Sequence, residues 1–490
     1  MIDLTMHEER LQHAIDRAKE RNILIPTFAQ MQNPALIPEN VKKALKSVGL
    51  WDVNPLNLFR ISWHNEPTMQ GGGFGGVNFI ELPSALTGVD ARIIVMCGKW
   101  FPTGCHKVGA SFGCLAPRLV TGQFDPTYNK AVWPSTGNYC RGGAYNSKLL
   151  GCDSIAILPA EMSRERFEWL SKIAGEVIAT PGCESNVKEI FDKTWELRRT
   201  RKDVIIFNQF EEMGNVLWHY QVTGHAIAEA YESIKPPTSR FAGACFTSGS
   251  AGTMSAGDYL KEQYPYSKLA VGEALQCPTL LENGFGGHRI EGIGDKHVPW
   301  VHNVRNTDMV IDIDDEDSQN LLRLFNSEEG HKYLREVAGV PEATIEQLSL
   351  LGISGIANVL CCIKFAKYYE LTGDDVVATV ATDSAVMYES RVKELNEQQG
   401  NYSLLTAARD FSEHLHGIRT DNMAELTYAD RKRVHNLKYY TWVEQQGKTV
   451  EELNAQWYDR DYWTGIHEQA KDLDKLINEF NARTGVAEKI

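Results

Sequence analysis

The chain carries a lysine among small residues in the stretch Pro102-Thr103-Gly104-Cys105-His106-Lys107-Val108-Gly109-Ala110-Ser111. The stretch follows an apolar run at residues 92–96 that predicts a β-strand, and it leads into a helical pattern. A lysine at such a strand-to-helix junction can serve as a Schiff-base nucleophile, because partial burial lowers its pKa. Taken alone, the pattern fits an ordinary surface lysine better.

Short apolar runs alternate with helical stretches on both sides of this lysine. The expected strands are residues 92–96, 154–158, 204–207, 241–245, 268–271, 309–313 and 376–380. Helical patterns lie between most of them, for example at 164–174 and 187–198. This alternation predicts an α/β fold with parallel sheets covered by helices on both faces. Because 490 residues exceed what one hydrophobic core usually organises, we expect two lobes.

Both ends of the chain are expected to be helical extensions. In the first 60 residues, Leu11, Ala14, Ile15 and Ala18 recur at helical spacing, and a second helix is expected from Pro38 to Gly49. After about residue 400 no further strand is expected. Thr449-Val450-Glu451-Glu452 is a candidate capping box, and a later helix would place Leu473, Leu476, Ile477 and Phe480 on one face.

Two further loops are rich in small and polar residues. Pro134-Ser135-Thr136-Gly137-Asn138-Tyr139 leads into a helical stretch, where hydroxyls and backbone N–H groups would suit a carboxylate. Thr247-Ser248-Gly249-Ser250-Ala251-Gly252-Thr253 follows an expected strand and precedes a helix, so it could bind a phosphate without a basic side chain. Plain helix-capping or glycine turns remain the alternatives for each loop.

Charge and cysteine content limit the partners. The net charge is −14, with acidic and basic residues interspersed, which disfavours nucleic acid and anionic membranes as partners. No apolar run reaches the roughly 18 residues that a membrane span requires. The 10 cysteines form no Cys-x-x-Cys pair and no cluster with zinc-ligand spacing, so we expect no metal site and a reduced, cytoplasmic setting.

Taken in order, these loops and several other blocks resemble the fold-type II pyridoxal-phosphate (PLP) enzymes, and most of all cysteine synthase and cystathionine β-synthase. The resemblance covers about residues 75–395. The supporting blocks are Pro102–Gly109, Ser135–Asn138, Asn208-Gln209-Phe210, Gly249–Thr253, Gly286-Gly287-His288-Arg289-Ile290-Glu291-Gly292-Ile293-Gly294, Leu351–Gly355 and Thr382-Asp383-Ser384. It implies a tryptophan synthase β-like fold, with two α/β lobes and PLP in the cleft between them.

The resemblance also implies a role for each matching residue. Lys107 would hold PLP as a Schiff base and then remove the substrate α-proton, Asn138 would contact the pyridine 3′-oxygen, and Ser384 the pyridine nitrogen. The loop expected to bind the phosphate consists of Gly249, Ser250, Ala251, Gly252 and Thr253. The residues expected to bind the substrate carboxylate are Ser135, Thr136, Gly137 and Gln209.

The implied reaction proceeds at the β-carbon of a small amino acid through an aminoacrylate, because a neutral hydroxyl at the pyridine nitrogen moderates electron withdrawal. The leading interpretation is β-replacement, as in cysteine synthase. The alternatives are β-elimination to a keto acid and ammonia, and a PLP-binding protein without turnover.

The implied organisation has four parts. A helical extension spans residues 1–60, a large PLP-binding lobe spans 61–112 and 213–395, a small substrate-side lobe spans 113–212, and a helical extension spans 396–490. The family analogy implies a homodimer. The chain departs from the cysteine synthase pattern at Cys105, where those enzymes usually carry serine, and at Tyr139, where they usually carry threonine.

Overall fold

The computed structural model describes residues 1–67, 70–135, 137–183 and 186–490. Its strands form two sheets, of seven and four strands. We call them the large sheet and the small sheet. The order in the large sheet is β1 (Phe79–Leu82), β2 (Arg92–Cys97), β10 (Asp375–Ala381), β7 (Arg240–Thr247), β8 (Lys268–Ala274), β9 (Met309–Ile313) and β11 (Met423–Glu425). The order in the small sheet is β5 (Glu176–Thr180), β4 (Asp153–Pro159), β3 (Lys130–Pro134) and β6 (Val204–Ile206).

Most strand pairs are parallel, as predicted. In the large sheet, β2, β10, β7, β8 and β9 run parallel to one another, and among the described strands the edge strands β1 and β11 pair antiparallel with β2 and β9. All strand pairs of the small sheet are parallel. The predicted α/β class is therefore confirmed.

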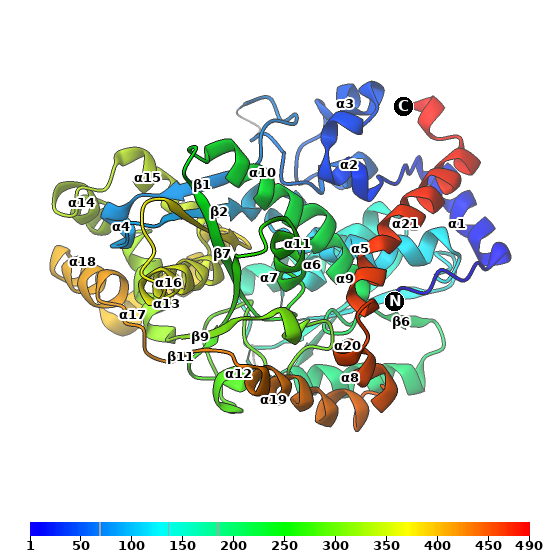
Figure 1. Cartoon of the computed structure of the whole chain (residues 1–490). Helices are drawn as coiled ribbons and strands as arrows, with labels where there is room; N and C mark the ends of the chain where they lie inside the picture. The colour runs from blue at the N-terminus through cyan, green and yellow to red at the C-terminus, as the bar shows by residue number, and fades with distance from the viewer. Residues whose placement is uncertain (68–69, 136, 184–185) are drawn as a thin grey trace.

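Helices bury both faces of the large sheet, which explains its continuous apolar strands. On β2, Ile94 and Met96 belong to one core cluster, while Ile93 and Val95 belong to the cluster that includes helix α16 (Ile353–Tyr368). Alternate residues of one strand thus face different helical layers. Figure 1 shows this sheet, with β1, β2 and β7, surrounded by helices.

The remaining helices of the central region cover the two sheets and connect their strands. They are α4 (Ser84–Thr87), α5 (Lys107–Val120), α6 (Asn138–Leu149), α7 (Arg164–Ile173), α8 (Val187–Thr200), α9 (Met213–Trp218), α10 (His225–Ile234), α11 (Met254–Gln263), α12 (Thr279–Glu282), α13 (Asp315–Leu324), α14 (Glu328–Glu336), α15 (Glu342–Gln347) and α17 (Glu389–Gln399). On the small sheet, α6 packs against β3 and β4, and Ile190 of α8 packs in a separate cluster with Val132 of β3 and Ile155 of β4.

The two ends of the chain pack against each other. The N-terminal helices are α1 (Glu8–Arg21), α2 (Phe28–Gln32) and α3 (Glu39–Leu45), and the C-terminal helices are α18 (Leu404–Asp410), α19 (Tyr428–Lys438), α20 (Val450–Tyr458) and α21 (Tyr462–Thr484). Figure 1 shows α1 beside α21, and these helices are in contact. The Asp474 carboxylate of α21 accepts hydrogen bonds from the N–H groups of Phe28 (2.6 Å) and Ala29 (3.1 Å), at the start of α2.

Some expected elements differ from the structure. The prediction that no strand follows residue 400 is wrong, because β11 adds three residues to the edge of the large sheet beside β9. The helix expected from Pro38 to Gly49 ends at Leu45. After it, the backbone N–H groups of Lys46, Ser47 and Val48 donate to carbonyls three residues earlier instead of four. The capping box at Thr449 is confirmed.

Candidate active site

The expected site residues of the large sheet follow three neighbouring strands. Lys107 comes after β2, Ser384 after β10, and the loop of residues 248–253 after β7. Because these strands are parallel and adjacent, their carboxyl ends lie at one edge of the sheet, where ligands of open α/β sheets bind. The backbone N–H of His106 donates to the carbonyl of Thr382 (3.3 Å), so the lysine loop lies against the end of β10.

Lys107 meets the loop of residues 248–253 directly. It is the first residue of α5, and its Nζ lies 3.1 Å from Oγ of Ser250. The same Oγ accepts a hydrogen bond from Nδ2 of Asn215 (3.1 Å), which also donates to the carbonyl of Gln209 (3.0 Å). Lys107, the candidate cofactor lysine, is therefore in contact with the loop that the sequence predicts as a phosphate site.

The loop of residues 248–253 has the form of an anion-binding site. Within the described part of the chain, the backbone N–H groups of Gly249, Ser250, Ala251 and Gly252 donate to no other residue. They precede α11, a helix of 10 residues, whose N-terminus carries partial positive charge. Ala251 has φ 60°, which turns the backbone sharply here. These features fit a phosphate group held by backbone donors.

Two of the residues expected to bind the substrate carboxylate follow the carboxyl ends of neighbouring strands of the small sheet. Ser135 follows β3 and Gln209 follows the adjacent parallel strand β6, and Nε2 of Gln209 lies 3.4 Å from Oγ of Ser135. Oγ of Ser135 accepts from the N–H of Gly137 (3.1 Å), which has φ 153°. Oε1 of Gln209 is buried and has no hydrogen-bond partner among the described residues. Thr136 lies outside the described residues.

Asn138, which follows a strand of the small sheet, contacts the segment after β10 that contains Ser384. Asn138 begins α6, and its Nδ2 donates to Oδ2 of Asp383 (2.7 Å), the residue before Ser384. Oδ1 of Asn138 is buried without a hydrogen-bond partner in the described chain. Ser384 is buried as well and stands at the N-cap position of the short helix Ala385–Tyr388, where its side chain makes no capping hydrogen bond. The amide of Asn138 therefore lies against the residue that directly precedes Ser384.

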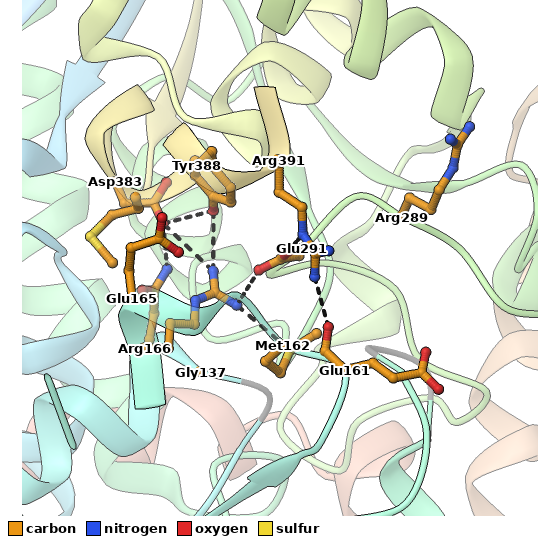
Figure 2. A network of polar contacts seen from close by, with 12 residues as sticks. Gly137, Glu161, Met162, Glu165, Arg166, Arg289, Glu291, Asp383, Tyr388 and Arg391 are labelled. Carbon is orange, nitrogen blue, oxygen red and sulfur yellow. Dashed lines mark hydrogen bonds and ion pairs between the residues drawn. The ribbon is translucent and has the colours of Figure 1, made fainter. Parts of the chain in front are cut away.

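Three residues of the site were not predicted from the sequence. Asn215 joins the phosphate loop to the Gln209 segment, and Asp383 and Arg166 lie in a buried polar network (Figure 2). Asp383 stood in a recognised block without an assigned role. Arg166 gave no signal, because the segment Ser163-Arg164-Glu165-Arg166 has the polar composition of an exposed helix start.

The residues next to Lys107 are buried and uncharged. Burial raises the pKa of the Cys105 thiol to about 12, and the nearby Asp383 carboxylate adds to the rise. Burial, together with the Lys107 ammonium group, lowers the pKa of His106 well below its usual value. His106 stacks on Trp63, with 5.6 Å between ring centroids. These buried side chains therefore support the lysine loop, and they add no second charged nucleophile beside Lys107.

Neither a metal site nor a membrane-spanning helix is found among the described residues. Within them, no group of three or more His, Cys, Asp or Glu side chains is arranged to hold a metal ion. In the same part of the chain, none of the helices combines the length and the apolar character needed to span a bilayer.

Comparison with known proteins gives consistent results. Residues 73–383 match the family model described as pyridoxal-phosphate dependent enzyme. A probable cysteine synthase of Bacillus subtilis (strain 168) is 29% identical over 301 residues, which cover 61% of this chain and 89% of that protein. Cystathionine beta-synthase of Saccharomyces cerevisiae is 25% identical over 317 residues, 63% of this chain and 59% of that protein.

Solved structures show the same fold. O-acetyl serine sulfhydrylase isoform 3 of Entamoeba histolytica superposes with a TM-score of 0.56 at 19% identity, covering 70% of this chain and 94% of that chain. An O-acetylserine dependent cystathionine beta-synthase from Helicobacter pylori superposes with a TM-score of 0.53 at 22% identity, covering 63% of this chain and 95% of that chain. The predicted fold class is confirmed.

Proposed function

Because the chain belongs to the family of pyridoxal-phosphate-dependent enzymes, we propose that it catalyses β-replacement on a serine- or cysteine-type amino acid. The observation that supports the proposal is the contact of Lys107 with Ser250, because the lysine proposed to hold the cofactor touches the loop proposed to bind its phosphate. The relatives named as cysteine synthases support the β-carbon as the reacting position.

The proposed binding residues follow the described geometry. The backbone N–H groups of residues 249–253 would hold the phosphate of PLP, Asn138 its 3′-oxygen and Ser384 its pyridine nitrogen. Ser135, Thr136, Gly137 and Gln209 would bind the substrate carboxylate, which agrees with the contact between Gln209 and Ser135 at 3.4 Å. Bound in this way, PLP would supply electron withdrawal from the substrate α-carbon, which weakens the bond between that carbon and its proton.

Lys107 has two proposed tasks. It would hold the cofactor through its Nζ. Once the substrate amine has taken its place on the cofactor, the free amine of Lys107 would remove the proton from the substrate α-carbon. Ser250 lies close enough to Nζ to orient it by a hydrogen bond. Ser384 offers a neutral hydroxyl rather than a carboxylate to the ring nitrogen, which favours early departure of the β-substituent.

The wider organisation is part of the same proposal. We propose a large lobe at 61–112 and 213–395, a small lobe at 113–212, and extensions at 1–60 and 396–490. The small sheet spans residues 130–206, inside the proposed small lobe. A cytoplasmic homodimer with a small amino acid as substrate, and without nucleic acid or membrane partners, completes the proposal.

The test is a turnover assay combined with the visible absorption spectrum of the purified protein. O-acetylserine, serine, cysteine and threonine are added singly, first without and then with sulfide. Formation of a new β-substituted amino acid that requires sulfide supports replacement. Keto acid and ammonia formed without sulfide would show elimination instead. A cofactor band that no amino acid changes would show a binding protein without turnover.

A further inference from the structure

A buried carboxylate links the two sheets beside the proposed cofactor site. Oδ2 of Asp383 accepts hydrogen bonds from Nδ2 of Asn138 (2.7 Å) and from the hydroxyl of Tyr388 (2.8 Å). Nη2 of Arg166 lies 4.0 Å from the same oxygen and 3.2 Å from the Tyr388 hydroxyl. Asp383 and Arg166 side chains are fully buried. We propose that Asp383, supported by Arg166 and Tyr388, is a positioning residue that fixes the amide of Asn138 for contact with the cofactor.

An asparagine amide needs such a partner to hold one orientation. The last side-chain torsion of asparagine is broad and roughly two-fold, so the amide oxygen and nitrogen can exchange places. Burial raises the pKa of Asp383, and the Arg166 guanidinium with the hydrogen bonds from Asn138 and Tyr388 opposes the rise. In its ionised form the carboxylate accepts hydrogen bonds but donates none, so it selects the orientation in which Nδ2 of Asn138 faces it. The position of Oδ1 and of the second amide hydrogen is then determined as well.

Asp383 itself is held in place by its surroundings. A Cβ added at Gly352 would lie 2.0 Å from Oδ1 of Asp383, so the backbone of Gly352 closely approaches the carboxylate. The N–H of Gly352 also donates to the carbonyl of Asp383 (3.1 Å). The carboxylate therefore has little room to follow Asn138 if the amide rotates.

Arg166 connects this carboxylate to the substrate loop and to a second acid. Its Nη1 lies 2.8 Å from Oε2 of Glu291, and both side chains are almost fully buried. A Cβ added at Gly137 would lie 2.6 Å from the same Nη1, so Arg166 packs directly under the residue before Asn138. Figure 2 shows Arg166 between Glu291 on one side and Asp383 with Tyr388 on the other. Because these groups are buried, removal of one charge would leave its partner buried without a compensating charge.

A second contact between the same regions bypasses Asp383 and serves as a control. The N–H and the hydroxyl of Ser390 donate to the carboxylate of Glu165 at 3.1 and 2.9 Å. Glu165 precedes Arg166 on α7, and Ser390 follows Tyr388 closely. Loss of this contact would loosen the packing of α7 against the segment after β10, but Asn138 would keep its hydrogen bond to Asp383.

The inference rests on the proposed contact of Asn138 with PLP, and the test uses the PLP-loaded enzyme. Asp383→Asn, Tyr388→Phe and Ser390→Ala are compared by cofactor dissociation constant, visible absorption against pH, and melting temperature. Asp383→Asn should raise the dissociation constant about 10-fold or more and shift the pH profile of the band, because a charge-assisted hydrogen bond is lost. Tyr388→Phe should act in the same direction more weakly, and Ser390→Ala should leave both spectral readouts at wild-type values.

The outcomes separate this inference from the proposed reaction. Lower melting temperatures with unchanged band and cofactor affinity in both Asp383→Asn and Tyr388→Phe would overturn it, since that is the result of a purely structural role. If Asp383→Asn does not fold, Tyr388→Phe decides by the same readouts. A wild-type protein that binds PLP without turnover contradicts the proposed reaction, yet the spectral comparison still decides the inference. A wild-type protein that binds no PLP overturns both.

Discussion

Nζ of Lys107 lies 3.1 Å from Oγ of Ser250, although the two residues are 143 positions apart in the chain. The contact joins the loop after β2 to the loop after β7, with β10 between these strands in the sheet. Parallel strands with crossover connections bring the two loops to the same edge. The site is therefore a product of topology rather than of one local motif.

Replacing Lys107 by alanine should abolish turnover. The variant lacks the amine that would hold the cofactor and take the α-proton, so we expect a fall in kcat of about 100-fold or more. The visible band should also disappear or lose its response to amino acids. Steady-state kinetics and absorption spectra measure both effects. A variant that keeps wild-type turnover would remove Lys107 from the mechanism.

Gly252→Ala should weaken cofactor binding by distorting the phosphate loop. An added Cβ would lie 2.1 Å from Oδ1 of Asn215, and Asn215 is held by its bonds to Gln209 and Ser250. The loop must therefore move, at a cost of about 1–3 kcal/mol. We expect the dissociation constant of PLP, measured by titration of the visible band, to rise about 10-fold, which corresponds to roughly 1.4 kcal/mol.

Gly76→Ala is the matched control for this substitution. Gly76 is exposed, has no left-handed backbone, and a Cβ added there meets nothing within 4 Å. The same chemical change should therefore leave PLP affinity and melting temperature at wild-type values. Equal losses in the two variants would show that the effect at Gly252 is not due to the loop contact with Asn215.

The strands that the sequence predicted have continuous apolar runs, although the missed strand β3 is also buried over four consecutive residues. β9 (Met309–Ile313) coincides with its predicted range, and the other predicted strands differ by a few residues at their ends. The strands β1, β3, β5 and β11 were missed. β5 lies at the edge of the small sheet with most of its residues half-buried or exposed, and β11 has only three residues. Such strands exist because a neighbour offers backbone partners, which local sequence does not report.

The sequence singled out candidate site residues where they stand in recognisable local blocks. Lys107, Ser135, Asn138 and Ser384 stood out by their blocks, and the structure brings these segments to the carboxyl ends of the strands. The buried network was not predictable. The side chain of Arg164 is 82% exposed and that of Arg166 is 0% exposed, yet both lie at the start of the same polar helix. Tertiary packing alone decides which arginine enters the interior.

Cys105 should be chemically inert despite its closeness to Lys107. Burial raises the pKa of its thiol to about 12, so almost no thiolate is present at neutral pH. Cys183 is partly exposed, whereas Cys105 is buried. Iodoacetamide should therefore label Cys183 first, as measured by peptide mass spectrometry, and Cys105→Ser should retain close to wild-type turnover. Rapid labelling of Cys105 in the folded protein would contradict this assignment.

Asp258 should make stability depend on pH in a defined window. Burial raises the pKa of this carboxyl from 3.8 to about 7, with Glu262 adding to the rise, while Lys261 and the amides of Asn303 and Asn306 oppose it. The pKa of the neighbouring His467 is lowered to about 3, so His467 stays neutral across the window. Between about pH 4 and pH 7 the folded chain thus binds one proton more than the unfolded chain at this site.

The sign of the effect follows from this proton difference. Protonated Asp258 contributes its full share to the free energy of unfolding below about pH 4. This contribution decreases as the pH rises to about 7, by about 4 kcal/mol at most. Asp258→Asn cannot ionise, so the free energy of unfolding of the wild type minus that of the variant should decrease over this window and then stay constant. Urea unfolding of both proteins at several pH values measures the difference. A difference that does not change with pH would show that Asp258 has the same pKa in the folded and the unfolded protein, which would contradict this prediction.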